Sequence, residues 1–118
     1  MDTPAQLHME KVADYLFERL SDCTAVVCYN DQVAYQLIEL ALKRGISIPE
    51  NLSVVGIDDS YLTNVSRVPL TSFPHPKEEL GRKAAENLVK MIEEPGFDGN
   101  YLFDSEPVIR NSIAEIVV

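Results

Sequence analysis

Residues 24–59 decide the fold of this chain, and they read TAVVCYNDQVAYQLIELALKRGISIPENLSVVGIDD. The runs 24–29 and 53–57 are apolar and β-branched, as in buried strands, and the first is typical of a strand covered on both faces. Between them, apolar side chains recur every three or four residues, which predicts a helix over 32–44 that stops at Gly45. Such a strand–helix–strand unit predicts two parallel strands with a right-handed crossover.

Further elements lie on both sides of this unit. Apolar side chains at helical spacing predict a first helix over roughly twenty N-terminal residues. A third short strand is expected at 70–73, and a helix from Pro76 to about Glu94. The tail carries strand-like runs at 101–103, 107–109 and 113–118. The expected fold class is therefore α/β, with an open, mainly parallel sheet flanked by helices.

Length and composition limit the possible functions. The 118 residues, 46% of them hydrophobic, leave room for one domain. A net charge of −9 repels nucleic acid, so this chain is not expected to bind DNA by itself. No membrane span or signal peptide is visible, and we expect a cytoplasmic protein without a membrane partner. Cys23 and Cys28 lack companion ligands for zinc, so no metal or cofactor is expected.

Polar side chains follow each predicted strand at its carboxyl end. Asn30 and Asp31 follow the first strand, Asp58 and Asp59 follow the second, and His75 follows the third. In an open parallel sheet, ligands bind just outside the carboxyl ends of the strands. If the strands are neighbours, an amide, carboxylates and an imidazole surround one crevice. This arrangement predicts a site for a small polar ligand.

Each of these side chains also has a structural interpretation, and the residues alone leave the choice open. Asn30 or Asp31 caps the following helix. The adjacent carboxylates need a donor, which a sugar hydroxyl, a backbone amide or a metal would supply. His75 is held between two prolines and suits a hydrogen bond to a hydroxyl, although a lone histidine is more often structural. The ring of Tyr29 suits the C–H face of a sugar and equally an ordinary core position.

An enzyme is not expected, because the sequence has neither a nucleophile with a base nor a Gly-rich phosphate loop. A phosphoacceptor receiver-type signalling domain is one alternative, with Asp31, Asp58 and Asp59 as its acidic group. Against it, no further Asp stands at a suitable strand end. A fragment of a sugar-metabolism enzyme of similar fold is the other alternative, because fold alone does not fix function.

Several linked motifs occur in order along residues 24–112: Thr24 to Ala34, Arg44 to Asp59, Val68 to Ser72, Leu80-Gly81 and Pro107 to Ser112. Together they resemble the effector-binding domain of lactose/galactose-repressor-type transcription regulators. The Asn-Asp-Gln sequence at 30–32 and the Pro-His-Pro-Lys sequence at 74–77 are most similar to the arabinose repressor branch. The resemblance implies a periplasmic-binding-protein-like (type I) fold of two α/β lobes, which bind a sugar between them.

The resemblance also implies roles for individual residues. Asn30 or its neighbour Asp31, together with Asp58 and His75, falls where effector contacts are made. Many relatives have Gln at the position of His75, so a different sugar is implied, with a pentose such as arabinose expected. A dimer interface is implied for the helix after Asn30 and the loop after Asp59, with the candidates Val33, Gln36, Leu37, Leu40, Tyr61 and Val65.

The matched motifs correspond only to the later part of such a sensor. We expect residues 1–118 to form a single fragment, the C-terminal lobe, without the first lobe and without a DNA-binding domain. DNA would then be reached only through a missing N-terminal domain, and sugar binding by this fragment would be weak or absent. The helix at 76–94 loses the lobe against which it packs. We therefore expect a homo-oligomer, with exchange of elements between copies as one arrangement.

Overall fold

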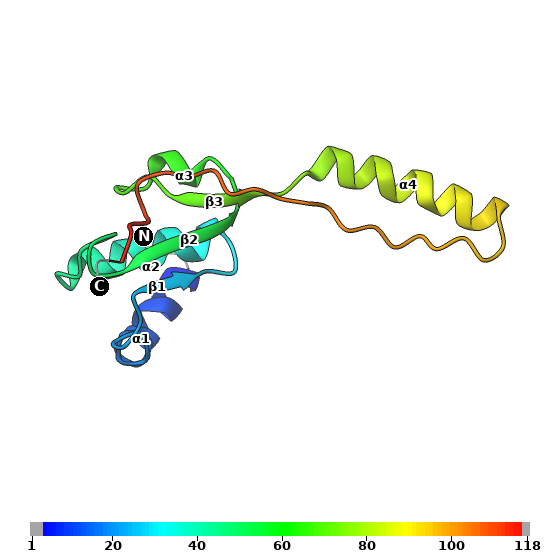
Figure 1. Ribbon diagram of the computed structural model, residues 1–118. Coiled ribbons are helices and arrows are strands. Elements are labelled where there is room, and N and C mark those ends of the chain that lie inside the picture. The colour runs from blue at the N-terminus through cyan, green and yellow to red at the C-terminus, as the bar shows by residue number, and fades with distance from the viewer. Residues whose placement is uncertain (1–3, 117–118) are drawn as a thin grey trace.

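The structure is a computed structural model that describes residues 4–116. The outer ends of the predicted first helix and last strand, 1–3 and 117–118, lie outside the described residues. Three parallel strands form one sheet in the order β1-β2-β3 (Figure 1), which confirms the predicted α/β class. The elements are α1 (Pro4–Arg19), β1 (Ala25–Val27), α2 (Asp31–Lys43), β2 (Ser53–Asp58), α3 (Leu62–Val65), β3 (Thr71–Pro74) and α4 (Lys77–Glu93).

The predicted strand–helix–strand unit is present as β1-α2-β2. The Asn30 side chain accepts a hydrogen bond from the backbone N–H of Val33 at 3.0 Å and so caps the first turn of α2. Lys43 stands in the last turn, where a cation suits the helix dipole. Gly45 follows with φ of +75°, a conformation that glycine adopts at low cost. Helix and strands therefore form where the sequence predicts them.

The hydrophobic core lies between α2 and the sheet. Ile38, Val54 and Leu70 are fully buried there. Burial of an aliphatic side chain of this size contributes about 1.5–3 kcal/mol. The complete cluster comprises Cys28, Ala34, Leu37, Ile38, Ala41, Ile48, Leu52, Val54 and Leu70.

Strand β1 differs from the prediction that it is covered on both faces. It is the edge strand of the sheet, and Val27 is 67% exposed. Within the described residues, no neighbouring strand or helix covers that side chain. The apolar run correctly indicated a strand, but not that the strand is covered on both faces.

The tail differs more strongly from its predicted strands. Neither 101–103 nor the described part of 113–118 forms a strand, and Val108 makes a single antiparallel bridge to Ser72. The segment around Ser112 nevertheless binds the sheet, because Ser112 accepts a hydrogen bond from the Val54 N–H with its backbone oxygen and one from the Thr71 N–H with its hydroxyl. Strand-like sequence without a partner strand therefore stays extended.

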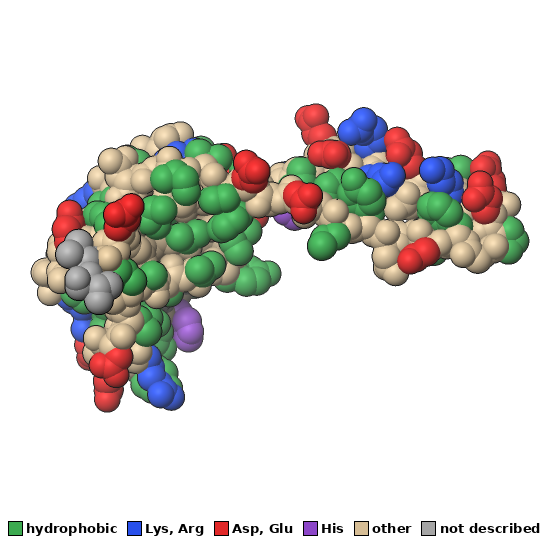
Figure 2. Space-filling model, viewed as in Figure 1, with side chains coloured by type: hydrophobic (Ala, Val, Ile, Leu, Met, Phe, Trp, Pro, Cys, Tyr) green, Lys and Arg blue, Asp and Glu red, His purple; other side chains and the backbone are tan. Residues whose placement is uncertain are grey.

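Residues 75–106 project from the rest of the molecule, and we call them the arm; the other described residues are the body. Figure 1 shows α4 running away from the sheet with the extended return segment beside it, and Figure 2 shows the narrow connection. The radius of gyration is 18.3 Å, whereas a compact chain of this length has roughly 13–14 Å. In α4 only Asn87 is buried, and its side chain donates to the Gly99 carbonyl at 3.0 Å. Most of the apolar side chains of α4 are therefore exposed.

No helix among residues 4–116 combines the length and the apolar character that crossing a lipid bilayer requires.

Candidate functional site at the strand ends

The three strand ends meet at one edge of the sheet. Asp58, the last residue of β2, is the register partner of Pro74, the residue before His75. On the other side, the Cys28 N–H donates to the Val55 carbonyl at 2.8 Å, two residues before Asn30. Because all pairings are parallel, the polar residues after the strands emerge at the same edge.

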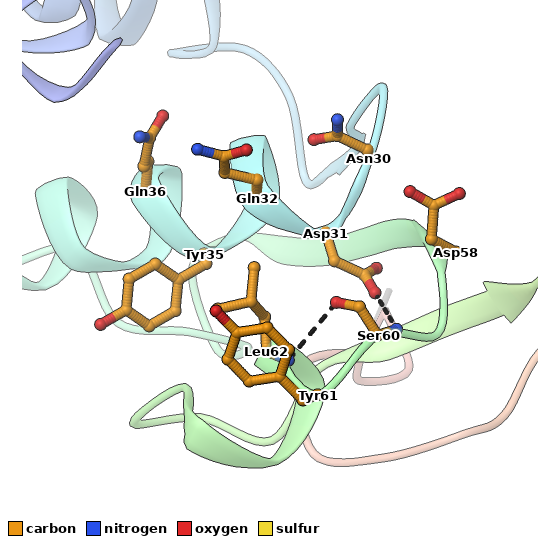
Figure 3. A pocket seen from close by; sticks show the side chains of 9 residues that line it. All are labelled: Asn30, Asp31, Gln32, Tyr35, Gln36, Asp58, Ser60, Tyr61 and Leu62. Carbon is orange, nitrogen blue, oxygen red and sulfur yellow. Dashed lines mark hydrogen bonds between the residues drawn. The ribbon is translucent and has the colours of Figure 1, made fainter. Parts of the chain in front are cut away.

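Asn30 and Asp58 line the same hollow, which has a volume of about 380 Å³. Figure 3 shows it between the start of α2 and the loop that leads into α3. Both side chains are half-buried and belong to neighbouring strand ends. The complete lining consists of Asn30, Asp31, Gln32, Tyr35, Gln36, Asp58, Ser60, Tyr61 and Leu62.

The Asn30 side chain can cap α2 and contact a ligand at the same time, because its amide has an acceptor end and a donor end. Its Oδ1 accepts from the Val33 N–H and thereby caps α2. Within residues 4–116 no partner is found for its Nδ2 group, which is the donor end of the amide. The cap therefore fixes the side chain and leaves a donor for a ligand oxygen.

Asp31 differs from the expectation of a ligand contact, because its carboxylate is used within the fold. The side chain is 1% exposed. Its Oδ2 accepts from the Ser60 N–H at 2.6 Å, and its Oδ1 accepts from the Ser72 hydroxyl at 2.5 Å. With both oxygens occupied and buried, Asp31 supports the site from inside.

The acidic pair at the end of β2 divides between two environments. The Asp59 carboxylate forms an ion pair with Arg110 at 2.7 Å, and the same guanidinium nitrogen donates to the Leu70 carbonyl. Asp58 has no such cation among the described residues and lines the hollow. Arg110 relieves the repulsion between the neighbouring carboxylates and leaves Asp58 as the acceptor that faces outward. Sequence reasoning missed Arg110 and Ser72, which lie far from this pair along the chain.

His75 and Tyr29 are not brought into this hollow. His75 is exposed and lines a separate depression of about 640 Å³ with Pro76 and with residues near the start of α4, namely Lys77, Glu78, Glu79 and Arg82. Tyr29 precedes Asn30 and is 85% exposed. Both belong to the edge of the strand ends, whereas the other predicted site residues, Asn30, Asp31 and Asp58, line the hollow.

A family model for the periplasmic-binding-protein-like domain matches residues 2–113. The chain belongs to this family. Its predicted resemblance to lactose/galactose-repressor-type sensors is confirmed, since its curated relatives and solved structural neighbours include regulators of that type.

Three relatives illustrate the likeness of this periplasmic-binding-protein-like domain to regulators. It is 43% identical over 95 residues to the arabinose metabolism transcriptional repressor of Geobacillus stearothermophilus, covering 79% of this chain and 26% of the repressor. The transcriptional regulator CelR in complex with cellobiose has a TM-score of 0.70 and 30% identity, over 82% of this chain and 30% of CelR. The lac repressor dimer bound to operator and the anti-inducer ONPF also has a TM-score of 0.70, with 26% identity over 78% of this chain and 32% of that repressor.

The chain spans about a quarter of the length of the curated relatives it matches. These relatives are transcriptional regulators, which fits a non-enzyme, and neither the receiver nor the sugar-enzyme alternative receives support.

The residues predicted for a dimer interface of this periplasmic-binding-protein-like domain divide into two groups. Tyr61, which precedes α3, and Val65, at its end, are exposed. Gln36 lines the hollow but is only 8% exposed. Leu37 is 2% exposed and belongs to the core, so its side chain is not on the surface where the prediction placed it. Val33 packs partly against the core, and Leu40 is half-buried.

The described residues of this domain contain no group of three His, Cys, Asp or Glu side chains placed to hold a metal ion. Burial raises the pKa of the Cys28 thiol to about 11. This thiol is therefore protonated at neutral pH and is not an activated nucleophile. The chemistry that the site offers is hydrogen bonding to a polar ligand.

Proposed function

We propose that this chain is the effector-binding portion of a sugar-responsive transcriptional repressor. The observation that carries the proposal is the shared hollow of Asn30 and Asp58 at neighbouring strand ends, in a chain of the periplasmic-binding-protein-like family. A pentose such as arabinose is the proposed effector, on the support of 43% identity with an arabinose metabolism repressor. Cytoplasmic location follows as part of the same proposal.

The two side chains supply complementary hydrogen-bonding groups for a sugar hydroxyl. The Nδ2 group of Asn30 donates, and the Asp58 carboxylate accepts from hydroxyl hydrogens. His75 and Tyr29 stand at the same edge, where an imidazole and an aromatic ring suit the rim of a sugar site. One wall of polar groups orients a sugar but does not enclose it. Small-molecule sites bury most of their ligand, so the opposite wall comes from another lobe.

DNA binding is proposed to reside in a separate domain. The net charge of −9 opposes contact between this chain and phosphates. The sugar would act by shifting the population between two arrangements of the lobes, and this shift would change the affinity of the DNA-binding domain for its operator.

We further propose that copies of the chain associate through the exposed side chains of Tyr61 and Val65, beside α2. The apolar side chains of α4 need a second partner, which in the complete regulator is the other lobe and in the isolated chain is the arm of another copy. The exposed members on α4 are Leu80, Leu88, Val89, Met91 and Ile92. Light scattering of the purified chain is expected to show a mass above that of one copy, and a monodisperse monomer would contradict this proposal.

A graft tests the proposed function directly. Residues 24–112 replace the corresponding stretch of the Geobacillus arabinose metabolism repressor, and operator release is followed by fluorescence anisotropy during titration with arabinose or cellobiose. Operator release by arabinose but not by cellobiose supports the proposal. A graft that binds operator but is released by neither sugar argues against it.

The Asp58→Asn variant of the graft separates sugar reading from DNA binding. The substitution replaces an anionic acceptor at the wall of the hollow with a neutral amide of nearly the same shape. Operator binding is expected to persist while release by arabinose is lost. If release survives, the assignment of Asp58 is wrong. Calorimetry on the isolated chain is expected to show weak or absent arabinose binding, and micromolar affinity would contradict the need for a second lobe.

A further inference from the structure

The turn that carries Asp58 has an unusual backbone. Asp58 has φ of +111° and Asp59 has φ of +52°, and neither residue is a glycine. L-residues rarely adopt such angles, which persist only where surrounding contacts hold them. The turn follows directly from β2, so its conformation sets the direction in which the Asp58 side chain leaves the sheet.

Two buried side chains hold this turn from inside. The Asp31 carboxylate accepts from the Ser60 N–H at 2.6 Å (Figure 3) and from the Ser72 hydroxyl at 2.5 Å. The Ser72 hydroxyl oxygen in turn accepts from the Asp59 N–H at 3.0 Å. Asp31 begins α2 and Ser72 belongs to β3, so the Ser60 and Asp59 amides are bound to the two elements beside β2. Both side chains have almost no exposed surface.

Gly56 makes room for this network. A Cβ at position 56 would lie inside the contact distance of Asp31 Oδ1 and within 3.3 Å of Asp31 Cα. The backbone of β2 and the start of α2 therefore approach each other closely only because residue 56 lacks a side chain. This close approach brings the Asp31 carboxylate within reach of the Ser60 N–H.

We propose that Asp31 and Ser72 are positioning residues for the effector site, which hold the 58–60 turn so that Asp58 stands beside Asn30. The role rests on the proposed function of Asp58 as an effector contact. Neither residue touches the sugar. Asp31 also sits next to Asn30 in the chain, so the same carboxylate fixes the start of α2 and the turn relative to each other.

Hydrogen exchange of the full chain, followed by NMR, tests the positioning role without any sugar. Ser72→Ala removes one oxygen, and Asp31→Ala removes both acceptors. Each is expected to speed exchange of the Asp59 and Ser60 amides at least tenfold relative to the β2 amides Val54 and Val55. Asp31→Asn keeps one acceptor oxygen and is expected to restore part of the protection.

Ser112→Ala is the matched control. Ser112 is also a fully buried serine whose hydroxyl joins β2 and β3, but it bonds Thr71 N and Val54 O at the opposite end of the strands. Its loss is expected to lower overall stability while the exchange of Asp59 and Ser60 keeps its ratio to the rest of the body. Equal ratios in Ser72→Ala and Ser112→Ala overturn the proposal. Failure of Ser72→Ala to fold also overturns it, because the role would then be global.

The same substitutions in the arabinose repressor graft separate this inference from the proposed function. Ser72→Ala is expected to raise the arabinose concentration for half-maximal operator release about tenfold, with operator affinity unchanged. A graft that releases operator normally in Ser72→Ala overturns the positioning role. A graft without substitutions that responds to no sugar contradicts the proposed function, and the exchange measurement still decides whether the turn is held by Asp31 and Ser72.

Discussion

Helices α2 and α4 have similar apolar patterns and opposite surroundings. Six of the thirteen residues of α2 are buried, among them Ile38 and Ala41 with no exposed surface. Of the seventeen residues of α4 only Asn87 is buried, while Ile92 is 74% exposed. The sheet supplies the surface that α2 covers, whereas no helix or strand among the described residues packs extensively on α4, and Asn87 bonds the return segment at Gly99. An amphipathic sequence thus specifies a helix, and a neighbouring element decides whether its apolar face is buried.

The largest expected difference between α2 and α4 is in the protection of their amides against hydrogen exchange. Amides of α2 and β2 are expected to exchange only when the whole body unfolds. Amides of α4 are expected to exchange through local unfolding, because little tertiary contact protects them. The difference approaches the whole free energy of unfolding, on the order of 5 kcal/mol for a small domain. Exchange measured by mass spectrometry or NMR, at a concentration where the chain is monomeric, checks it. Equal protection of both helices would show that α4 has found a partner.

Paired truncations sharpen the comparison at single side chains. Ile38→Ala leaves a cavity in the core and is expected to cost about 2–5 kcal/mol. Leu88→Ala removes a side chain that is exposed on α4 of a single copy. At a concentration where the chain is monomeric, the free energy of unfolding of the body should therefore change by less than about 0.5 kcal/mol. Urea unfolding followed by circular dichroism measures both. A large cost at Leu88 in the monomer would mean that the arm packs against the body.

The pH dependence of thiol labelling compares the accessibility of the body with that of the arm. The pKa of Cys28, raised by burial to about 11, leaves little thiolate below that pH, and the folded body shields the sulfur. In a Cys23→Ser background and at a concentration where the chain is monomeric, a Leu88→Cys thiol on the arm is expected to react with iodoacetamide at least 100-fold faster than Cys28 at pH 8. The Cys28 rate should rise as pH approaches 11. Comparable rates at pH 8 would show that the body opens readily.

Capping gives the smallest expected difference. Asn30→Ala removes the side-chain cap of α2 and should destabilise the body by about 1 kcal/mol. Helix α4 begins after Pro76 without any side-chain cap. Pro76→Asp should therefore stabilise the helix by a few tenths of a kcal/mol to about 1 kcal/mol and so raise its helix content. Circular dichroism at 222 nm and thermal melting separate the two effects. A lower melting temperature in Pro76→Asp would mean that Pro76 supports the body.

The sequence was sufficient for elements whose signals are local. The crossover from β1 to β2 followed from one continuous stretch, and the cap at Asn30 from a single residue type at the start of a helix. The meeting of the strand ends followed from the parallel order, because parallel strands direct their carboxyl ends to one edge. Asn30 and Asp58 were therefore predictable as neighbours.

The remaining differences depend on contacts between residues far apart in the chain. Asp31 is 41 residues from Ser72, and Arg110 is 51 residues from Asp59, so spacing gave no sign of either contact. Leu37 shares the apolar face of α2 with surface candidates, and only the position of the sheet shows that it faces the core. The tail runs needed a partner strand, which no local pattern can supply.

The two crossings between body and arm meet at a single point. The Ser105 hydroxyl donates to the Pro74 carbonyl at 2.9 Å, so the outgoing and returning chains leave and re-enter the sheet edge together. The arm is therefore an insertion whose two ends lie next to each other. A short linker between positions 74 and 105 could therefore excise it without stretching the remaining polypeptide, and a foreign module with closely spaced termini could be installed in its place.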